Sequence, residues 1–111
     1  MTEKFDAIIV GAGQAGPPLA GRLTAAGQTV AVIERKLVGG TCVNSGCIPT
    51  KTLVASAHAA HLARRGGEFG VNTGPVTVDM AKVKARKDRI STGDREGVES
   101  WLEGMKGATL I

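Results

Sequence analysis

A loop of three spaced glycines constrains the fold of this chain more than any other feature of its sequence. The loop reads Gly11-Ala12-Gly13-Gln14-Ala15-Gly16, and it follows the short apolar run of residues 5–10 and precedes a helix-like stretch. A G-x-G-x-x-G loop between a strand and a helix is typical of dinucleotide-binding folds. Gly11 permits the tight turn, Gly13 lets the backbone approach a pyrophosphate, and Gly16 allows close helix–strand packing. The free amides at the helix N-terminus would then face the phosphates.

The residues after the loop complete a strand–helix–strand unit. Residues 15–26 read as a helix that Gly27 ends, with Pro17 and Pro18 tolerated in the first turn because amides there have no intrahelical acceptor. Residues 29–33 read as a second buried parallel strand. We therefore expect an α/β fold with a Rossmann-like βαβ unit.

Glu34 stands 23 positions after Gly11, at the end of the second strand. A carboxylate at this place can accept hydrogen bonds from the hydroxyls of an adenosine ribose, and it would repel the 2′-phosphate of NADP. The sequence therefore predicts a bound dinucleotide, and this motif by itself leaves both NAD and FAD open.

Two cysteines, Cys42 and Cys47, lie five residues apart. In a regular helix that spacing separates their Cα atoms by about 8.6 Å, whereas a disulfide requires less than about 7 Å. Either no bridge forms, or the backbone between them departs from a helix, which Gly46 would permit. A short-looped bridge of this kind would be easily reduced. Inert buried thiols remain an alternative, as does a zinc site that adds His58 and His61.

A helix is expected to begin after the second cysteine, and it adds to the chemistry of this segment. A thiol at a helix N-terminus has its thiolate stabilised by the helix dipole. Lys51 lies one turn beyond Cys47, where an ammonium group can stabilise a nearby anion.

The second half of the chain reads as a helical pair followed by the start of a strand. Residues 48–65 predict an alanine-rich helix, and Asp79 is the expected N-cap of a helix that runs to about Met105. The apolar seam of that second helix includes Met80, Val83, Ile90, Val98, Trp101 and Met105. Residues 108–111 read as the opening of another strand, so we expect residues 1–111 to form an incomplete domain.

Composition excludes several classes of protein. The net charge is +4, and the basic stretch of residues 82–89 reads as a solvated helix face. With one Trp, two Phe and no Tyr, the chain lacks stacking platforms for nucleic acid. No apolar run reaches the length of a membrane span or resembles a signal peptide, so we expect a cytoplasmic protein. In that compartment a close cysteine pair is more often catalytic or metal-binding than structural.

The stretch Gly39-Gly40-Thr41-Cys42-Val43-Asn44-Ser45-Gly46-Cys47-Ile48-Pro49-Thr50-Lys51 resembles the class I pyridine nucleotide–disulfide oxidoreductases. Dihydrolipoamide dehydrogenase, glutathione reductase and mercuric reductase belong to this family, and the resemblance is greatest to the mercuric-reductase-like branch. It implies that the bound dinucleotide is FAD and that a reversible Cys42–Cys47 disulfide is the catalytic group. The residues that match the family's FAD ligands are Gly11, Gly13, Gly16, Glu34, Gly40, Thr41 and Lys51.

The resemblance also implies a reaction. NADH or NADPH passes hydride to FAD, FAD reduces the disulfide through the flavin-proximal Cys47, and the outer Cys42 exchanges with a small-molecule disulfide or a metal-ion substrate. The family's nicotinamide domain, second FAD segment and dimerisation domain have no counterpart in residues 1–111. We therefore expect the N-terminal part of the FAD-binding domain of a homodimer, with no resident metal and no nucleic-acid or membrane partner.

Two other hypotheses remain at this point. The chain could be a non-catalytic dinucleotide-binding module with structural cysteines. It could also be a small regulatory or interaction protein that is complete at 111 residues.

Overall fold

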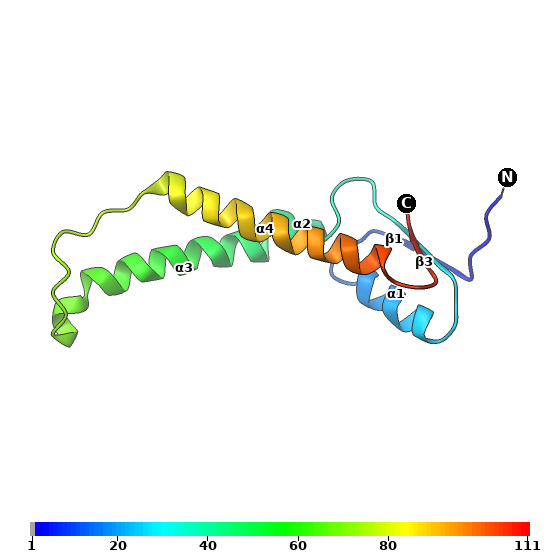
Figure 1. Cartoon of the computed structure of the whole chain (residues 1–111), viewed down its shortest axis with the longest axis horizontal. Helices are drawn as coiled ribbons and strands as arrows, with labels where there is room; N and C mark the ends of the chain where they lie inside the picture. Colours follow the sequence, from blue (N-terminus) through cyan, green and yellow to red (C-terminus); the bar gives the residue numbers. More distant parts are fainter. Residues whose placement is uncertain (1) are drawn as a thin grey trace.

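The computed structural model describes residues 2–111 as a small parallel sheet with a long helical hairpin projecting from it (Figure 1). The elements follow the order expected for a βαβ unit, a helical pair and a further strand. They are β1 (Ala7–Val10), α1 (Gly16–Ala25), β2 (Val30–Ile33), α2 (Gly40–Asn44), α3 (Cys47–Arg64), the 3₁₀ helix η1 (Gly66–Phe69), α4 (Met80–Glu103) and β3 (Ala108–Leu110). The α/β fold class is therefore confirmed.

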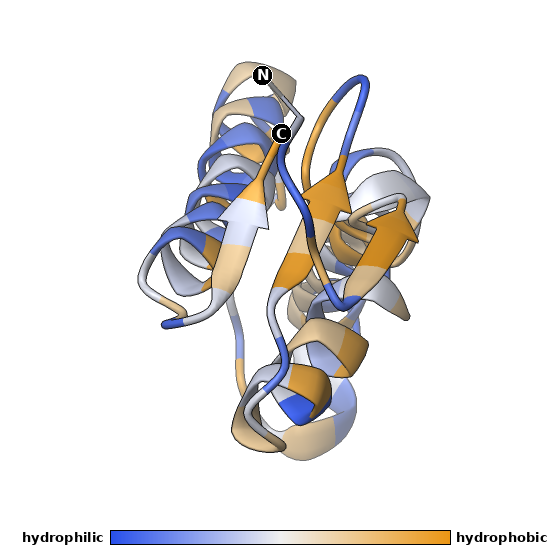
Figure 2. Cartoon of the chain, turned by 90° about the vertical axis from the view of Figure 1, so that its right-hand side faces the viewer, coloured by the Kyte–Doolittle hydropathy of each residue, from blue (hydrophilic) through white to orange (hydrophobic). Residues whose placement is uncertain are grey.

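The three strands form one parallel sheet in the order β1-β2-β3. Figure 2 shows β2 between its neighbours, with all three arrows pointing the same way. Val30 pairs with Ala7 on one side and with Ala108 on the other. Every side chain from Val30 to Val32 is buried, as expected for a central parallel strand that lacks a polar face.

The first two strands begin later than the sequence predicts. The reason is a clamp between Asp6 and Thr29: the Asp6 carboxylate accepts the Thr29 amide at 2.8 Å and the Thr29 hydroxyl at 2.9 Å. These bonds hold the pKa of Asp6 below its usual value, the backbone amide of Thr29 being the larger cause. Because the Thr29 amide bonds to the Asp6 side chain, it does not take part in the hydrogen bonding between the strands. The first strand therefore begins at Ala7 and the second at Val30.

The start of α1 agrees with the sequence analysis. The helix begins at Gly16, which places Pro17 and Pro18 in the first turn. At the other end Gly27 adopts a φ of +84°, the left-handed conformation that commonly ends a helix.

The core lies between the sheet, α1 and the C-terminal end of α4. Its buried members are Ala12, Ala20, Val30, Val32, Val38 and Leu102. Leu102 is only 1% exposed, whereas Trp101, which the expected seam of α4 contains, is 49% exposed. Met80 of that seam is also exposed. Only the C-terminal end of α4 reaches the sheet, and this is why Leu102 is buried and Met80 is not.

The helical hairpin of α3 and α4 makes the molecule elongated, with principal extents of 67 × 25 × 18 Å. The two helices lie side by side over much of their length (Figure 1). Asp79 caps α4 as expected, since its carboxylate accepts the Lys82 amide at 3.1 Å. Among residues 2–111 no helix combines the length and the apolar character that crossing a membrane requires.

Candidate functional site

The glycine loop joins the end of β1 to the start of α1. Gly11 has a φ of +105°, so a side chain there would be strained. A Cβ on Gly16 would collide with the carbonyl oxygen of Gly11, which requires glycine at this third position. The first turn of α1 carries no acidic side chain and no side-chain cap. Because Pro17 and Pro18 of this turn have no amide hydrogen, the turn offers an anion mainly the positive end of the helix dipole.

Glu34 contacts this loop directly. Its Oε2 accepts a hydrogen bond from the Ala12 amide at 3.0 Å, and its Oε1 accepts one from the Lys36 amide at 2.9 Å. The Ala12 amide, and after it the Lys36 amide, hold the pKa of the Glu34 carboxyl below its usual value. The carboxylate is therefore ionised at neutral pH and fixed against the loop.

A second pair of glycines approaches the same loop from the segment after Glu34. The Gly39 amide donates to the Ala12 carbonyl at 2.8 Å. Gly40 has a φ of +64°, and a Cβ on it would lie 2.8 Å from the Cα of Gly13. The expected site residues Gly13 and Gly40 thus meet backbone to backbone, although 27 positions separate them in the sequence.

Cys42 and Cys47 form a disulfide, with their Cα atoms 4.6 Å apart. The helix breaks between them: α2 ends at Asn44, and α3 begins at Cys47. Gly46 lies in the break with φ −120° and ψ −111°, and a Cβ on it would lie 2.9 Å from the Thr41 carbonyl oxygen. The irregular backbone expected at Gly46 is therefore present, and the pair is not two free thiols.

The two sulfur-bearing residues have different surroundings. Cys47 is the first residue of the 18-residue α3 and is exposed, whereas Cys42 is half-buried within α2. The N-terminal end of α3 stabilises a thiolate on Cys47 rather than on Cys42. Lys51, one turn further along α3, is also exposed.

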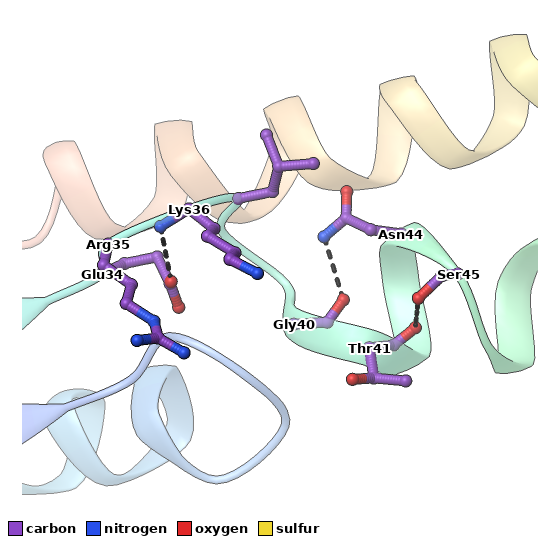
Figure 3. A pocket seen from close by; sticks show the side chains of 8 residues that line it. Glu34, Arg35, Lys36, Gly40, Thr41, Asn44 and Ser45 are labelled. Atoms are coloured by element: carbon purple, nitrogen blue, oxygen red, sulfur yellow. Dashed lines mark hydrogen bonds between the residues drawn. The ribbon is translucent and has the colours of Figure 1, made fainter.

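Two cavities are lined by residues of the glycine loop and of the segment that follows the second strand. One of about 290 Å³ follows the glycine loop and is lined by Gly11, Gly13, Gln14 and Gly16 among others. The other, of about 600 Å³, opens beyond Glu34 (Figure 3). Its walls are Glu34, Arg35, Lys36, Leu37, Gly40, Thr41, Asn44 and Ser45. Of the site residues expected from the sequence, six line these two cavities, whereas Lys51, Cys42 and Cys47 line neither.

Five of the eight residues that line the larger cavity were not singled out from the sequence: Arg35, Lys36, Leu37, Asn44 and Ser45. Arg35 and Lys36 place two cations beside Glu34, and their position directly after the acidic strand end was the available signal. Asn44 lies between the cysteines, a position at which a turn-forming amide could have been noticed.

The alternative of a zinc site finds no geometric support. The rings of His58 and His61 stack on one another with centroids 6.4 Å apart. Within residues 2–111 no group of three or more His, Cys, Asp or Glu side chains is arranged to hold a metal ion.

These observations define an α/β dinucleotide-binding unit that carries a short-loop disulfide at a helix start. The family model described as pyridine nucleotide-disulphide oxidoreductase matches residues 5–108. The chain therefore belongs to the pyridine nucleotide-disulphide oxidoreductase family.

Named relatives agree with this assignment. The dihydrolipoyl dehydrogenase of Chlorobaculum parvum is 38% identical over 103 residues, which are 93% of this chain and 22% of that protein. The dihydrolipoyl dehydrogenase of Bacillus subtilis is 39% identical over 106 residues, 96% of this chain and 22% of that protein.

A solved structure agrees as well. The Cu(II) complex of the HOCl-induced flavoprotein disulfide reductase RclA from Escherichia coli superposes with a TM-score of 0.75 at 34% identity. That match covers 99% of this chain and 22% of RclA. The chain thus spans about a fifth of the length of these relatives.

Proposed function

We propose that residues 1–111 form the N-terminal part of the FAD-binding domain of a longer flavoprotein that reduces disulfides with electrons from NADH or NADPH. The observation that carries this proposal is the Cys42–Cys47 disulfide, formed at a helix start in a segment that also contacts the glycine loop. The chain spans about a fifth of its relatives, so the nicotinamide site and the dimer contacts would lie on the remaining length.

The residues of this chain fit FAD. The loop residues Gly11, Gly13 and Gly16 present backbone in place of side chains, and a Cβ on Gly16 has no room. The pyrophosphate would be held by these glycines with Gly40 and Thr41, the ribose by Glu34, and the region of the flavin would include Lys51. When bound, FAD supplies the two-electron chemistry that connects a nicotinamide donor to the disulfide.

The chain's own part in the reaction is thiol–disulfide exchange. Two electrons and two protons convert the Cys42–Cys47 disulfide into two thiols. The Cys42 thiolate attacks a substrate disulfide, so a mixed disulfide forms and one substrate thiol leaves. The Cys47 thiolate then attacks the sulfur of Cys42, which restores the Cys42–Cys47 bond and releases the second substrate thiol. The helix start at Cys47 favours the thiolate needed for that last step.

The test uses the whole protein that carries this chain. It is expected to purify yellow with bound FAD and to oxidise NADH or NADPH when a disulfide is supplied. Cys42→Ser is expected to abolish this turnover and to keep the flavin. Turnover that Cys42→Ser leaves unchanged would instead favour structural cysteines, as in the alternative of a dinucleotide-binding module. A colourless protein that takes up no added FAD would refute the proposed flavoprotein function.

The substrate is a second proposal. The dihydrolipoyl dehydrogenases among the relatives favour a small-molecule disulfide. Three observations favour a metal-ion substrate instead. The sequence resembles the mercuric-reductase-like branch, the two cysteines hold soft sulfur ligands close together, and the similar protein RclA has been solved as a Cu(II) complex. Rates of nicotinamide oxidation with lipoamide, glutathione disulfide, Hg²⁺ and Cu²⁺, measured side by side, would distinguish these substrates.

The assembly and the location of the protein also remain proposals. A homodimer in the cytoplasm is what the family resemblance and the composition favour. Light scattering of the purified whole protein would give its oligomeric state, and cell fractionation its location.

A further inference from the structure

We propose that Asn44 is a positioning residue that joins the disulfide to the dinucleotide loop. The inference rests on the proposed function only in requiring that the Cys42–Cys47 disulfide opens and closes reversibly. Asn44 lies between the two cysteines, two residues after Cys42 and three before Cys47.

The carboxamide of Asn44 bonds backwards along the chain. Its Nδ2 donates to the carbonyl oxygens of Val38 and Gly40, both at 2.9 Å. Figure 3 shows the amide nitrogen turned to Gly40 and the amide oxygen turned toward α4. One side chain therefore fixes the end of α2 to the residues that precede and open it.

These bonds matter because α2 has only five residues. A helix of that length is not stable by itself in water. Gly39, the residue before α2, provides no side-chain cap, and the Ser45 hydroxyl after it makes only a long bond of 3.5 Å to the Thr41 carbonyl. Val38 is only 5% exposed, so its carbonyl requires an internal partner, which Asn44 supplies.

The segment that Asn44 holds is also the segment that contacts the glycine loop. Gly39 donates its amide to the Ala12 carbonyl at 2.8 Å, and Gly40 packs against the Cα of Gly13. Asn44 thus bonds to the residues on either side of the Gly39–Ala12 contact. The same carboxamide that orders the backbone around Cys42 orders the wall of the dinucleotide loop.

A specific consequence follows for the redox pair. Ring closure between Cys42 and Cys47 is favoured when the intervening backbone is already ordered, because less conformational entropy is lost on bond formation. Without the two donors of Asn44, the Val38 and Gly40 carbonyls lose their side-chain partner and α2 loosens. The equilibrium constant for disulfide formation should fall about three- to tenfold, as expected for one or two lost hydrogen bonds. For a two-electron couple this fall raises the reduction potential by about 15 to 30 mV.

The experiment measures the cysteine couple directly in the whole protein. Wild type and Asn44→Leu, which is similar in size and lacks the donors, are equilibrated in dithiothreitol buffers, and the free thiols are alkylated and quantified by mass spectrometry. Asn44→Asp, the isosteric variant with acceptors in place of donors, is measured in parallel. It keeps the proposal testable where Asn44→Leu does not fold. Thr73→Val is the matched control, because it removes a side-chain bond to the Ala63 carbonyl at the far end of the hairpin.

The expected result is a raised potential and weaker FAD binding in both Asn44 variants, with Thr73→Val at the wild-type potential. An unchanged potential in the Asn44 variants, even with a lowered melting temperature, would overturn the inference and reduce Asn44 to a purely structural role. An equal shift in Thr73→Val would overturn it too. A wild-type disulfide that never equilibrates with dithiothreitol would instead defeat the proposed function, so the two failures are distinguishable.

Discussion

Oε2 of Glu34 accepts the backbone amide of Ala12 at 3.0 Å, which joins the end of β2 to the glycine loop after β1. The same carboxylate accepts the Lys36 amide through its other oxygen. Both carboxylate oxygens are thus oriented by the backbone before any ligand arrives, and each retains a lone pair for a further donor. The acidic residue at this strand end acts both as a structural tie and as a preformed acceptor.

Glu34→Gln is expected to weaken FAD binding about tenfold, because one acceptor oxygen is replaced by an amide group that cannot accept, and bonds to a charged group are among the stronger ones. Flavin titration of the apoprotein, prepared from the whole protein, measures the change. Glu68→Gln is the control, since Glu68 pairs with Arg65 on the exposed 3₁₀ helix η1. Equal losses in the two variants would contradict the role given to Glu34.

The pKa of Glu34 predicts a dependence on acid. Its folded-state pKa is lowered, chiefly by the Ala12 amide, so its contribution is complete above the unfolded pKa and is lost as the pH falls through the folded value. Because FAD binds the folded protein, its affinity should hold from neutral pH to below the ordinary glutamate pKa of about 4.3 and fall only as the pH drops through the lower folded pKa of Glu34. Flavin fluorescence against pH measures this fall. This fall should disappear in Glu34→Gln. The lowered pKa values of Asp6, Glu68 and Asp88 bear on the free energy of unfolding, which should still decrease in acid in that variant.

Gly40→Ala is expected to reduce FAD affinity about tenfold or more, because a left-handed φ costs a residue with a Cβ about 1–2 kcal/mol and the new methyl would displace Gly13. Gly93→Ala is the matched control. Gly93 lies within α4 with nothing near its missing Cβ, so this change should leave FAD binding intact and raise stability by about 0.5–1 kcal/mol. Normal affinity in Gly40→Ala would show that the contact between the two glycine segments is unimportant for the ligand.

Leu102→Ala is expected to lower the free energy of unfolding by about 2–5 kcal/mol, as is typical of emptying a buried leucine site. Leu102 is 1% exposed and joins α4 to the core beneath the sheet. Denaturant unfolding of the whole protein measures the loss. Leu62→Ala on α3, where the leucine is 45% exposed, should change the free energy far less. A similar loss in both variants would mean that α4 is not held through Leu102.

Features that depend on neighbouring residues could be predicted from the sequence. The apolar run before Gly11, the paired prolines after Gly16 and the cap at Asp79 each act within a few residues, and each marks an element found in the structure. The break between the cysteines could also be anticipated. Helix geometry and disulfide geometry are incompatible at a spacing of five, so the alternatives could be stated in advance although not decided.

Features that depend on tertiary contacts could not be predicted. Ala12 and Glu34 are 22 residues apart, and no sequence feature near either residue predicts their hydrogen bond. Leu102 and Trp101 are adjacent and both apolar, so burial of the first alone depends on how α4 approaches the sheet. The same holds for Asn44, because its two bonds need the backbone of residues 38–40 to turn back toward α2.

The meeting of Gly13 and Gly40 bears on how this protein can be studied by mutation. Their contact is made entirely by main-chain atoms, with 2.8 Å between the Cα of Gly13 and the point where a Cβ of Gly40 would stand. Truncating a side chain removes nothing at such positions, because neither glycine has a side chain to lose. Only replacements that add atoms can reveal this contact.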